Sequence, residues 1–70
     1  MNWSLTYREK QVLELLDKGA TTQEIADQLG ITTHTIKNHL ASAAQKLGTI
    51  GRGRTSTLAE ARRLHLIRKG

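Results

Sequence analysis

The amino-acid sequence predicts an all-α fold, a four-helix bundle-like domain, and three features support this prediction. A Thr is followed by a Glu three residues later at three places, which is typical of capped helix starts. Glycines follow the segments in which apolar residues recur at helical spacing, and helices commonly end at a residue in the left-handed conformation. The chain contains no proline, and no segment alternates β-branched and polar residues over the length of a strand. Its 70 residues fit one domain, 1–70, whose hydrophobic core must be thin.

The first two helices are predicted over residues 7–18 and 22–29. Each begins at a Thr whose hydroxyl accepts a hydrogen bond from a free backbone N–H, while the Glu three residues on reaches back to the Thr N–H. These capping pairs are Thr6 with Glu9 and Thr21 with Glu24. Gly19 and Gly30 are the expected stops. The apolar residues expected to build most of the core are Val12, Leu13, Leu16, Ile25, Ala26, Leu29 and, in the following turn, Ile31.

The third helix is predicted over residues 33–47, between a cap at Thr32 or Thr33 and a stop at Gly48. Together with the second helix and the tight turn 29–32, it has the layout of a helix-turn-helix, whose second helix enters the major groove of DNA. An ordinary helical hairpin uses the same small residues at the crossing and in the turn. This layout alone therefore does not decide between a DNA-binding helix-turn-helix and an ordinary helical hairpin.

The fourth helix is predicted over residues 57–65, opening on a capping box of Thr57 and Glu60. Residues 48–57 hold three of the six glycines and show no helical period, so they are expected to form a flexible basic loop.

Charge is divided unevenly along the chain, whose net charge is +5. Residues 1–27 hold three basic against five acidic residues, whereas residues 28–70 hold eight basic residues against one acidic residue. The positive field of residues 28–70 attracts phosphate backbones or anionic membranes. A basic face can also simply be exposed to solvent without binding a partner. We therefore expect the second part of the chain to carry the contact surface.

The third helix separates into two faces when its residues are placed about 100° apart around the axis. The apolar stripe consists of Ile36, Leu40, Ala43 and Leu47. Near the opposite pole are His34, Asn38, Ala41, Ser42 and Gln45, flanked by Lys37 on one side and by Thr35, His39 and Lys46 on the other. No acidic residue occurs on this helix. Such a face suits a helix pressed into a groove of nucleic acid, because small residues allow close approach and lysines meet phosphates.

Asn38 is the leading candidate for reading a base, since its amide can pair with N6 and N7 of adenine; its alternative role is that of a plain surface amide. Lys37 can reach guanine or a phosphate, and its position does not decide between them. The start of the second helix offers backbone N–H groups and a positive dipole end that suit a phosphate. Its residues are Thr21, Thr22 and Gln23, although capping alone explains Thr21 equally well.

Four separated blocks, LTYRE, TTQEIADQLGIT, TIKNH and KLG, occur in this order. Over roughly residues 5–67 they resemble the LuxR-type (FixJ or NarL-type) effector domain. The resemblance implies a four-helix domain that binds double-stranded DNA in bacterial transcription regulation, often as a dimer on two half-sites, as in the effector domain of a response regulator. It implies base contacts by Lys37, Asn38 and Ala41 and backbone contacts near Thr22, Gln23, Thr35 and His39. To these we add His34 toward bases, and Thr21, Lys46, Arg52 and Arg54 toward the backbone.

Two departures from the family pattern affect the expected partners. Two more residues than usual separate KLG from Arg54, and the longer loop includes an additional Gly and Arg that suit a phosphate. In the last helix, Glu60 and Arg63 lie away from the face of Leu58, Ala61 and Leu64. We therefore expect a homodimer that is weak or forms on DNA, and RNA polymerase is a further candidate partner.

Other classes of protein fit the sequence less well. The two histidines of the third helix are five residues apart, unlike the i, i+4 pair of a zinc protease, and the chain has no Cys. We expect no catalytic residue, metal or cofactor, and hence no enzyme. Region 4 of a sigma factor uses a similar helix-turn-helix but usually lacks the last helix. A protein-docking module that kept the fold is a third alternative. Without cysteines, signal peptide or membrane span, the expected location is the cytoplasm and no membrane partner is expected.

Overall fold

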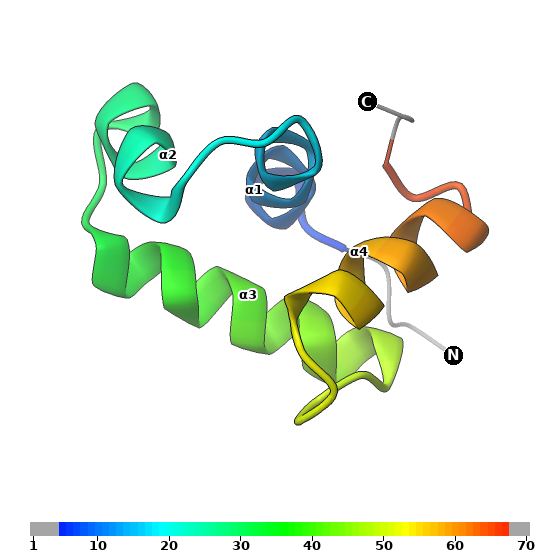
Figure 1. The fold of residues 1–70 in the computed structure, drawn as a ribbon. Coiled ribbons are helices and arrows are strands. Elements are labelled where there is room, and N and C mark those ends of the chain that lie inside the picture. The colour runs from blue at the N-terminus through cyan, green and yellow to red at the C-terminus, as the bar shows by residue number, and fades with distance from the viewer. Residues whose placement is uncertain (1–4, 68–70) are drawn as a thin grey trace.

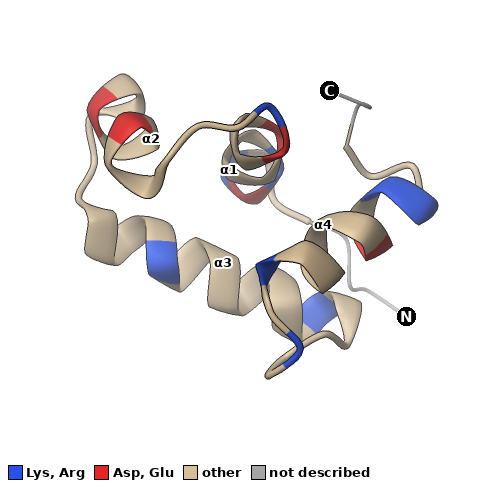
Figure 2. Cartoon of the chain, viewed as in Figure 1, with Lys and Arg blue, Asp and Glu red and all other residues tan. Residues whose placement is uncertain are grey.

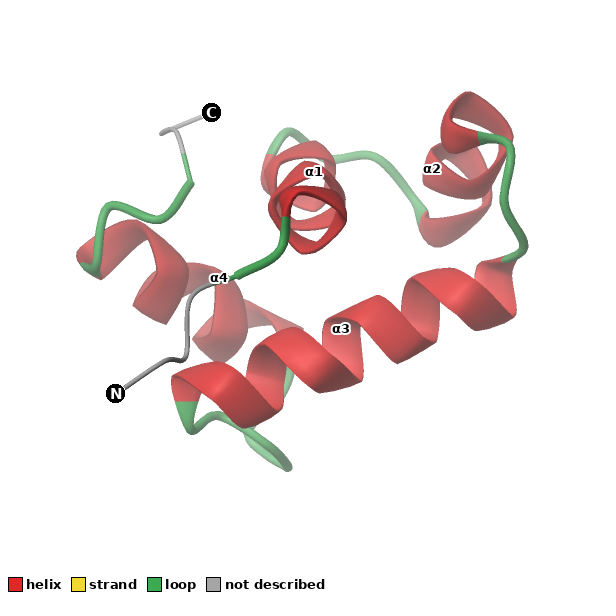
Figure 3. Ribbon diagram, turned by 180° about the vertical axis from the view of Figure 1, so that it is seen from behind, coloured by secondary structure: helices red, strands yellow, loops and turns green. Residues whose placement is uncertain are grey.

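The computed structural model describes residues 5–67, and within this range the chain forms four helices and no strand. They are α1 (Tyr7–Asp17), α2 (Thr22–Leu29), α3 (Thr33–Leu47) and α4 (Arg54–Arg63). The all-α prediction is confirmed. Figure 1 shows α3 crossing the molecule on one side of α1 and α2, with α4 packed near its C-terminal end. Figure 3 shows the same arrangement from behind.

The predicted capping boxes at the starts of α1 and α2 are both present. The Thr6 hydroxyl accepts from the Glu9 N–H at 3.1 Å, and Glu9 Oε1 accepts from the Thr6 N–H at 2.9 Å. Thr21 and Glu24 make the same pair of bonds at 3.1 and 2.8 Å. Each box satisfies two N–H groups that a helix start leaves without a partner, so these two starts are determined locally.

The turn between α2 and α3 agrees with the predicted helix-turn-helix. Gly30 ends α2 with a φ of 71°, in the left-handed region, and its N–H donates to the carbonyl of Ala26. Thr32 rather than Thr33 caps α3, because its hydroxyl accepts from the Thr35 N–H at 3.2 Å. This turn sets the angle at which α3 leaves α2.

The predicted start of α4 is wrong. The helix covers Arg54–Arg63 instead of 57–65, and it begins at Gly53 without a side-chain cap. Thr57 is buried within its first turns, hydrogen-bonds the Thr49 hydroxyl at 2.7 Å and donates to the Gly53 carbonyl at 3.2 Å. Its hydroxyl therefore ties α4 to the end of α3, and the expected capping box with Glu60 does not form. The loop before α4 is correspondingly shorter than predicted.

The core consists of two clusters that share α1 and α3. One joins α1, α3 and α4 and consists of Leu5, Leu13, Ala43, Leu47, Ala61 and Ile67. The other joins α1, α2 and α3 and consists of Val12, Leu16, Ile25, Ala26 and Ile36. Leu29 and Ile31, expected in the core, are half-buried at its edge. Because α3 belongs to both clusters, its orientation is held along its whole length.

The acidic residues are distributed along the chain as the sequence predicted. Figure 2 shows Asp and Glu on α1, α2 and α4, whereas α3 carries only basic positions among its charged residues. Among residues 5–67, no helix is both long enough and apolar enough to cross a membrane.

Candidate nucleic-acid interface

The outward face of α3 presents the four predicted base-reading residues to solvent. His34, Lys37, Asn38 and Ala41 are all exposed. Within residues 5–67, the side chains of His34, Lys37 and Asn38 make no hydrogen bond or ion pair, so their polar atoms are available to a ligand. The structure thus places these four side chains together on one surface.

The opposite side of α3 is fixed by burial. Ile36 and Ala43 are fully buried and Leu47 is nearly so, while Leu40 is half-buried and packs against both clusters. This agrees with the predicted apolar stripe. Burying one large aliphatic side chain stabilises a fold by about 1.5–3 kcal/mol, so turning α3 to present another face would forfeit several such contributions.

One flank of α3 is less accessible than the sequence suggested. Thr35 and His39 are half-buried. The Thr35 hydroxyl lies 3.0 Å from that of Thr32, so it is shared with the cap of the helix. A hydroxyl can still serve one further partner in this arrangement, because it has one donor and two acceptor sites.

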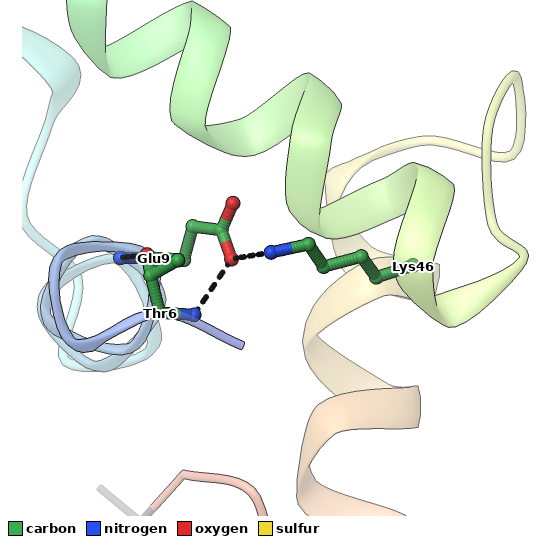
Figure 4. A network of polar contacts seen from close by, with 3 residues as sticks. All are labelled: Thr6, Glu9 and Lys46. Carbon is green, nitrogen blue, oxygen red and sulfur yellow. Dashed lines mark hydrogen bonds and ion pairs between the residues drawn. The ribbon is translucent and has the colours of Figure 1, made fainter. Parts of the chain in front are cut away.

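Lys46, a predicted contact to the DNA backbone, is engaged within the fold. Its ammonium lies 2.8 Å from Glu9 Oε1, which also accepts from the Thr6 N–H, as Figure 4 shows. The side chain of Glu9 is only 4% exposed and that of Lys46 is 27% exposed. Lys46 is therefore a structural residue that joins α3 to α1. Ser42, one turn before it, is half-buried and contributes to lowering the pKa of Glu9.

The environment of Glu9 keeps its carboxylate ionised. Burial alone raises the pKa of Glu9, but hydrogen bonds from Lys46, from Ser42 and from the Thr6 N–H, with the charge of Lys46, outweigh it. The pKa falls from its ordinary value of 4.5 to about 2. The Lys46 ammonium and the Thr6 N–H thus both donate to Glu9 Oε1, which joins the start of α1 to the end of α3.

We expect this carboxylate to make the fold acid-sensitive. Because its folded-state pKa lies below the unfolded value, its stabilisation is present above about pH 4.5 and is lost as the pH falls toward about 2. Urea unfolding should show a loss of about 2–3 kcal/mol across this window. Glu9→Gln should lose clearly less over the same window, since Gln has no proton to gain. Equal acid sensitivity in both proteins would contradict this role.

The start of α2 brings together the other polar residues predicted to meet the backbone of DNA. Thr21 is exposed and its hydroxyl is engaged in the capping box, while Thr22 is half-buried. Gln23 is exposed, and its amide donates to Asp27 at 3.0 Å. These residues belong to the helix that crosses α3 at the turn.

Two exposed arginines follow α3, Arg52 in the loop and Arg54 at the start of α4. Neither forms an ion pair in the part of the chain that the structure describes. The pKa of Glu60 is lowered mainly by its hydrogen bond to Arg63, and the charge of Arg52 contributes least. Arg54 was expected in the loop but is the first residue of α4. The side chain of Ile50 is 62% exposed. The sequence did not indicate this exposure, because a single Ile in a polar loop can equally well be buried.

No group of three His, Asp or Glu side chains within residues 5–67 is placed to hold a metal ion. His34 and His39 both lie on α3, one exposed and one half-buried, and His65 lies beyond the end of α4.

Comparison with known proteins gives consistent matches. Residues 3–59 match the family model described as "GerE: Bacterial regulatory proteins, luxR family". The chain is 52% identical over 48 residues to the spore germination protein GerE of Bacillus subtilis (strain 168), covering 69% of this chain and 65% of that protein. It is 39% identical over 64 residues to the transcriptional regulatory protein LiaR of the same organism, covering 91% of this chain and 29% of LiaR.

A solved structure described as that of the transcription factor GerE superimposes with a TM-score of 0.87 at 33% identity, covering all of both chains. The chain thus spans just under two thirds of the GerE protein of B. subtilis and less than a third of LiaR.

Proposed function

The chain belongs to the LuxR family of bacterial regulatory proteins, and on that premise we propose that it binds a specific sequence of double-stranded DNA to regulate transcription. In this proposal α3 lies in the major groove and its outward face reads the bases.

One observation carries the proposal: the outward face of α3 is exposed, free of acidic residues and free of internal hydrogen bonds at His34, Lys37 and Asn38. A solvated helix face usually mixes Glu with Lys, which gives pairs along the helix. A face without acids does not repel phosphates, and side chains without internal partners break no bond within the domain when they bond a base.

Each of the four residues has a chemical reason to approach bases. The Asn38 amide matches N6 and N7 of adenine, and the Lys37 ammonium matches O6 or N7 of guanine. The small side chain of Ala41 lets the helix approach closely and can contact the methyl group of thymine. His34, in the first turn, has two ring nitrogens that can face a base edge.

Contacts to the sugar-phosphate backbone would position the domain without reading sequence. We assign them to the start of α2, to the less exposed flank of α3, to the loop before α4 and to the first residue of α4. The residues are Thr21, Thr22, Gln23, Thr35, His39, Arg52 and Arg54. Lys46 is left out because its ammonium is paired with Glu9.

A homodimer of this domain would be weak or would form on DNA. The apolar face of α4 is used inside the domain, since Ala61 is buried and Leu58 and Leu64 pack against the core. Its outer side carries Arg62, which pairs with Asp17 of α1 at 3.2 Å, and Arg63, which pairs with Glu60. Little apolar surface is left there for a partner subunit. RNA polymerase is a further proposed partner, and the bacterial cytoplasm is the proposed location.

A salt titration tests the proposal. A duplex should first be selected from a random DNA pool, and its affinity measured by fluorescence anisotropy between about 50 and about 200 mM salt. With the two arginines of the backbone set neutralising about two phosphates, the logarithm of the affinity should fall with a slope of about −2 against the logarithm of salt. Arg54→Ala should make the slope shallower by about 1, whereas Lys10→Ala, an exposed change on α1, should leave it unchanged. A selected duplex that binds no better than a shuffled one would refute the proposed function.

A further inference from the structure

The segment 50–54, Ile-Gly-Arg-Gly-Arg, has a composition and a position that the major-groove contact of α3 does not explain. It extends from the end of α3 on the side away from α1 and α2, as Figures 1 and 3 both show. The outward face of α3 also lies away from α1 and α2, because the apolar stripe of α3 packs against α1, α2 and α4. A duplex that meets the outward face would therefore also meet this segment.

A shallow hollow of about 210 Å³ lies between α3 and the segment. On one side it is lined by Ala41 and Ala44 of α3, and on the other by Gly51, Gly53 and Arg54. The small residues Ala41 and Ala44 on one side, and Gly51 and Gly53 on the other, leave room for a ligand between them. In B-DNA a sugar-phosphate strand separates the major groove from the minor groove. A strand lying along this hollow would have α3 in the major groove on one side and residues 50–54 at the minor groove on the other.

The backbone of the segment is suited to a narrow groove. Gly51 and Gly53 have φ values of 77° and 92°, which L side chains rarely adopt, and no atom lies within 4 Å of the place where a Cβ would be. The strip beside both glycines is thus open to an approaching molecule. Since the minor groove is only about 6 Å wide, a segment without side chains at alternate positions fits it best.

The side chains that remain are of the kind that minor-groove binding segments use. Arg52 and Arg54 are exposed and have no ion pair among residues 5–67. Arginine is attracted by the strong negative potential of narrow, A·T-rich minor grooves. Ile50 adds an exposed aliphatic group beside them, and minor-groove proteins commonly set such a group against the base steps.

We propose that residues 50–54 enter the minor groove next to the major groove occupied by α3, where Arg52 and Arg54 favour A·T base pairs. The segment is then a second sequence-reading element, beyond the backbone contact assigned to it above. This inference rests on the proposed function, since it requires α3 to bind DNA.

Three duplexes with the same selected core and different short flanks at both ends test the inference. The flanks contain A·T pairs, G·C pairs, or inosine·C pairs, which have the major-groove edge of G·C but lack the guanine amino group in the minor groove. The A·T and inosine·C duplexes should bind the whole chain equally well, about five- to thirtyfold more tightly than the G·C duplex. Arg52→Ala with Arg54→Ala should bind all three more weakly and with equal affinity.

Lys10→Ala with Lys18→Ala is the matched control, because it removes two positive charges at exposed positions of α1 and its C-cap. It should keep the flank preference. Equal binding of the three flanks by the unmodified chain would mean a phosphate contact only and would overturn the inference. A preference for A·T that inosine·C does not share would place the readout in the major groove and would overturn it as well. Failure to bind any duplex would refute the proposed function itself, which separates the two failures.

Discussion

Replacing Lys46 by Met should lower the free energy of unfolding by about 2–4 kcal/mol, a large part of the stability of a domain of this size. The reason is that the Glu9 carboxylate is almost completely buried and would lose the ammonium 2.8 Å away. An uncompensated buried charge costs more than the pair itself contributes. Thermal unfolding followed by circular dichroism should show a melting temperature lower by at least about 10 °C.

Lys37→Met is the matched control, since it makes the same substitution in the same helix at an exposed residue without an ion pair. It should change stability by less than about 0.5 kcal/mol. Combining Lys46→Met with Glu9→Gln should recover part of the loss, because a neutral Gln can keep the bond to the Thr6 N–H. If Lys46→Met were as stable as the control, Lys46 would be free to contact DNA and its assignment to the fold would be wrong.

Replacing Lys37 and Asn38 together by Ala should weaken binding to the selected duplex by about two orders of magnitude. Two contacts to base edges would be lost, and each is worth about 1–3 kcal/mol of discrimination. Both side chains are exposed, and Ala is a stronger helix former than either residue, so α3 should remain folded. Fluorescence anisotropy with the selected duplex measures the loss, and far-UV circular dichroism checks the fold.

Lys10→Ala with Gln28→Ala provides the control for this variant. It removes one ammonium and one amide at exposed positions of α1 and α2, outside the proposed interface. Its affinity for the selected duplex should stay within about twofold to threefold of that of the unmodified chain, the effect of one distant charge on DNA binding. A loss equal to that of the α3 variant would show that net charge, rather than the outward face, determines affinity.

The starts of α1, α2 and α3 could be predicted from the sequence because the signals that determine them are local. Thr6 and Thr21 each find their partner within three residues, and Gly30 supplies the left-handed residue that the turn requires. The outward face of α3 was predictable for a similar reason, since Ile36 and Leu47 mark the side that must be buried.

The start of α4, and contacts that the sequence did not reveal, depend on distant segments that a local pattern does not include. Thr57 has the spacing of a helix cap, but its hydroxyl bonds Thr49, eight residues earlier, and the helix begins three residues sooner. Lys46 lies on a flank of α3 that a helical projection leaves open, because the projection does not include the neighbouring helix that carries Glu9. The same limit applies to Ile50 and the arginines after it. The hollow that Arg54 lines together with Ala41 depends on how the loop folds back toward α3.

The most direct test of the central claim, that the outward face of α3 reads DNA sequence, is the ratio of the affinities for the selected and the shuffled duplex at one salt concentration. For the unmodified chain this ratio should be about a thousand or more. For Lys37→Ala with Asn38→Ala it should fall by about two orders of magnitude, while the affinity for the shuffled duplex changes only a few-fold. A double variant that keeps the full ratio would contradict the claim that these residues of α3 read the bases.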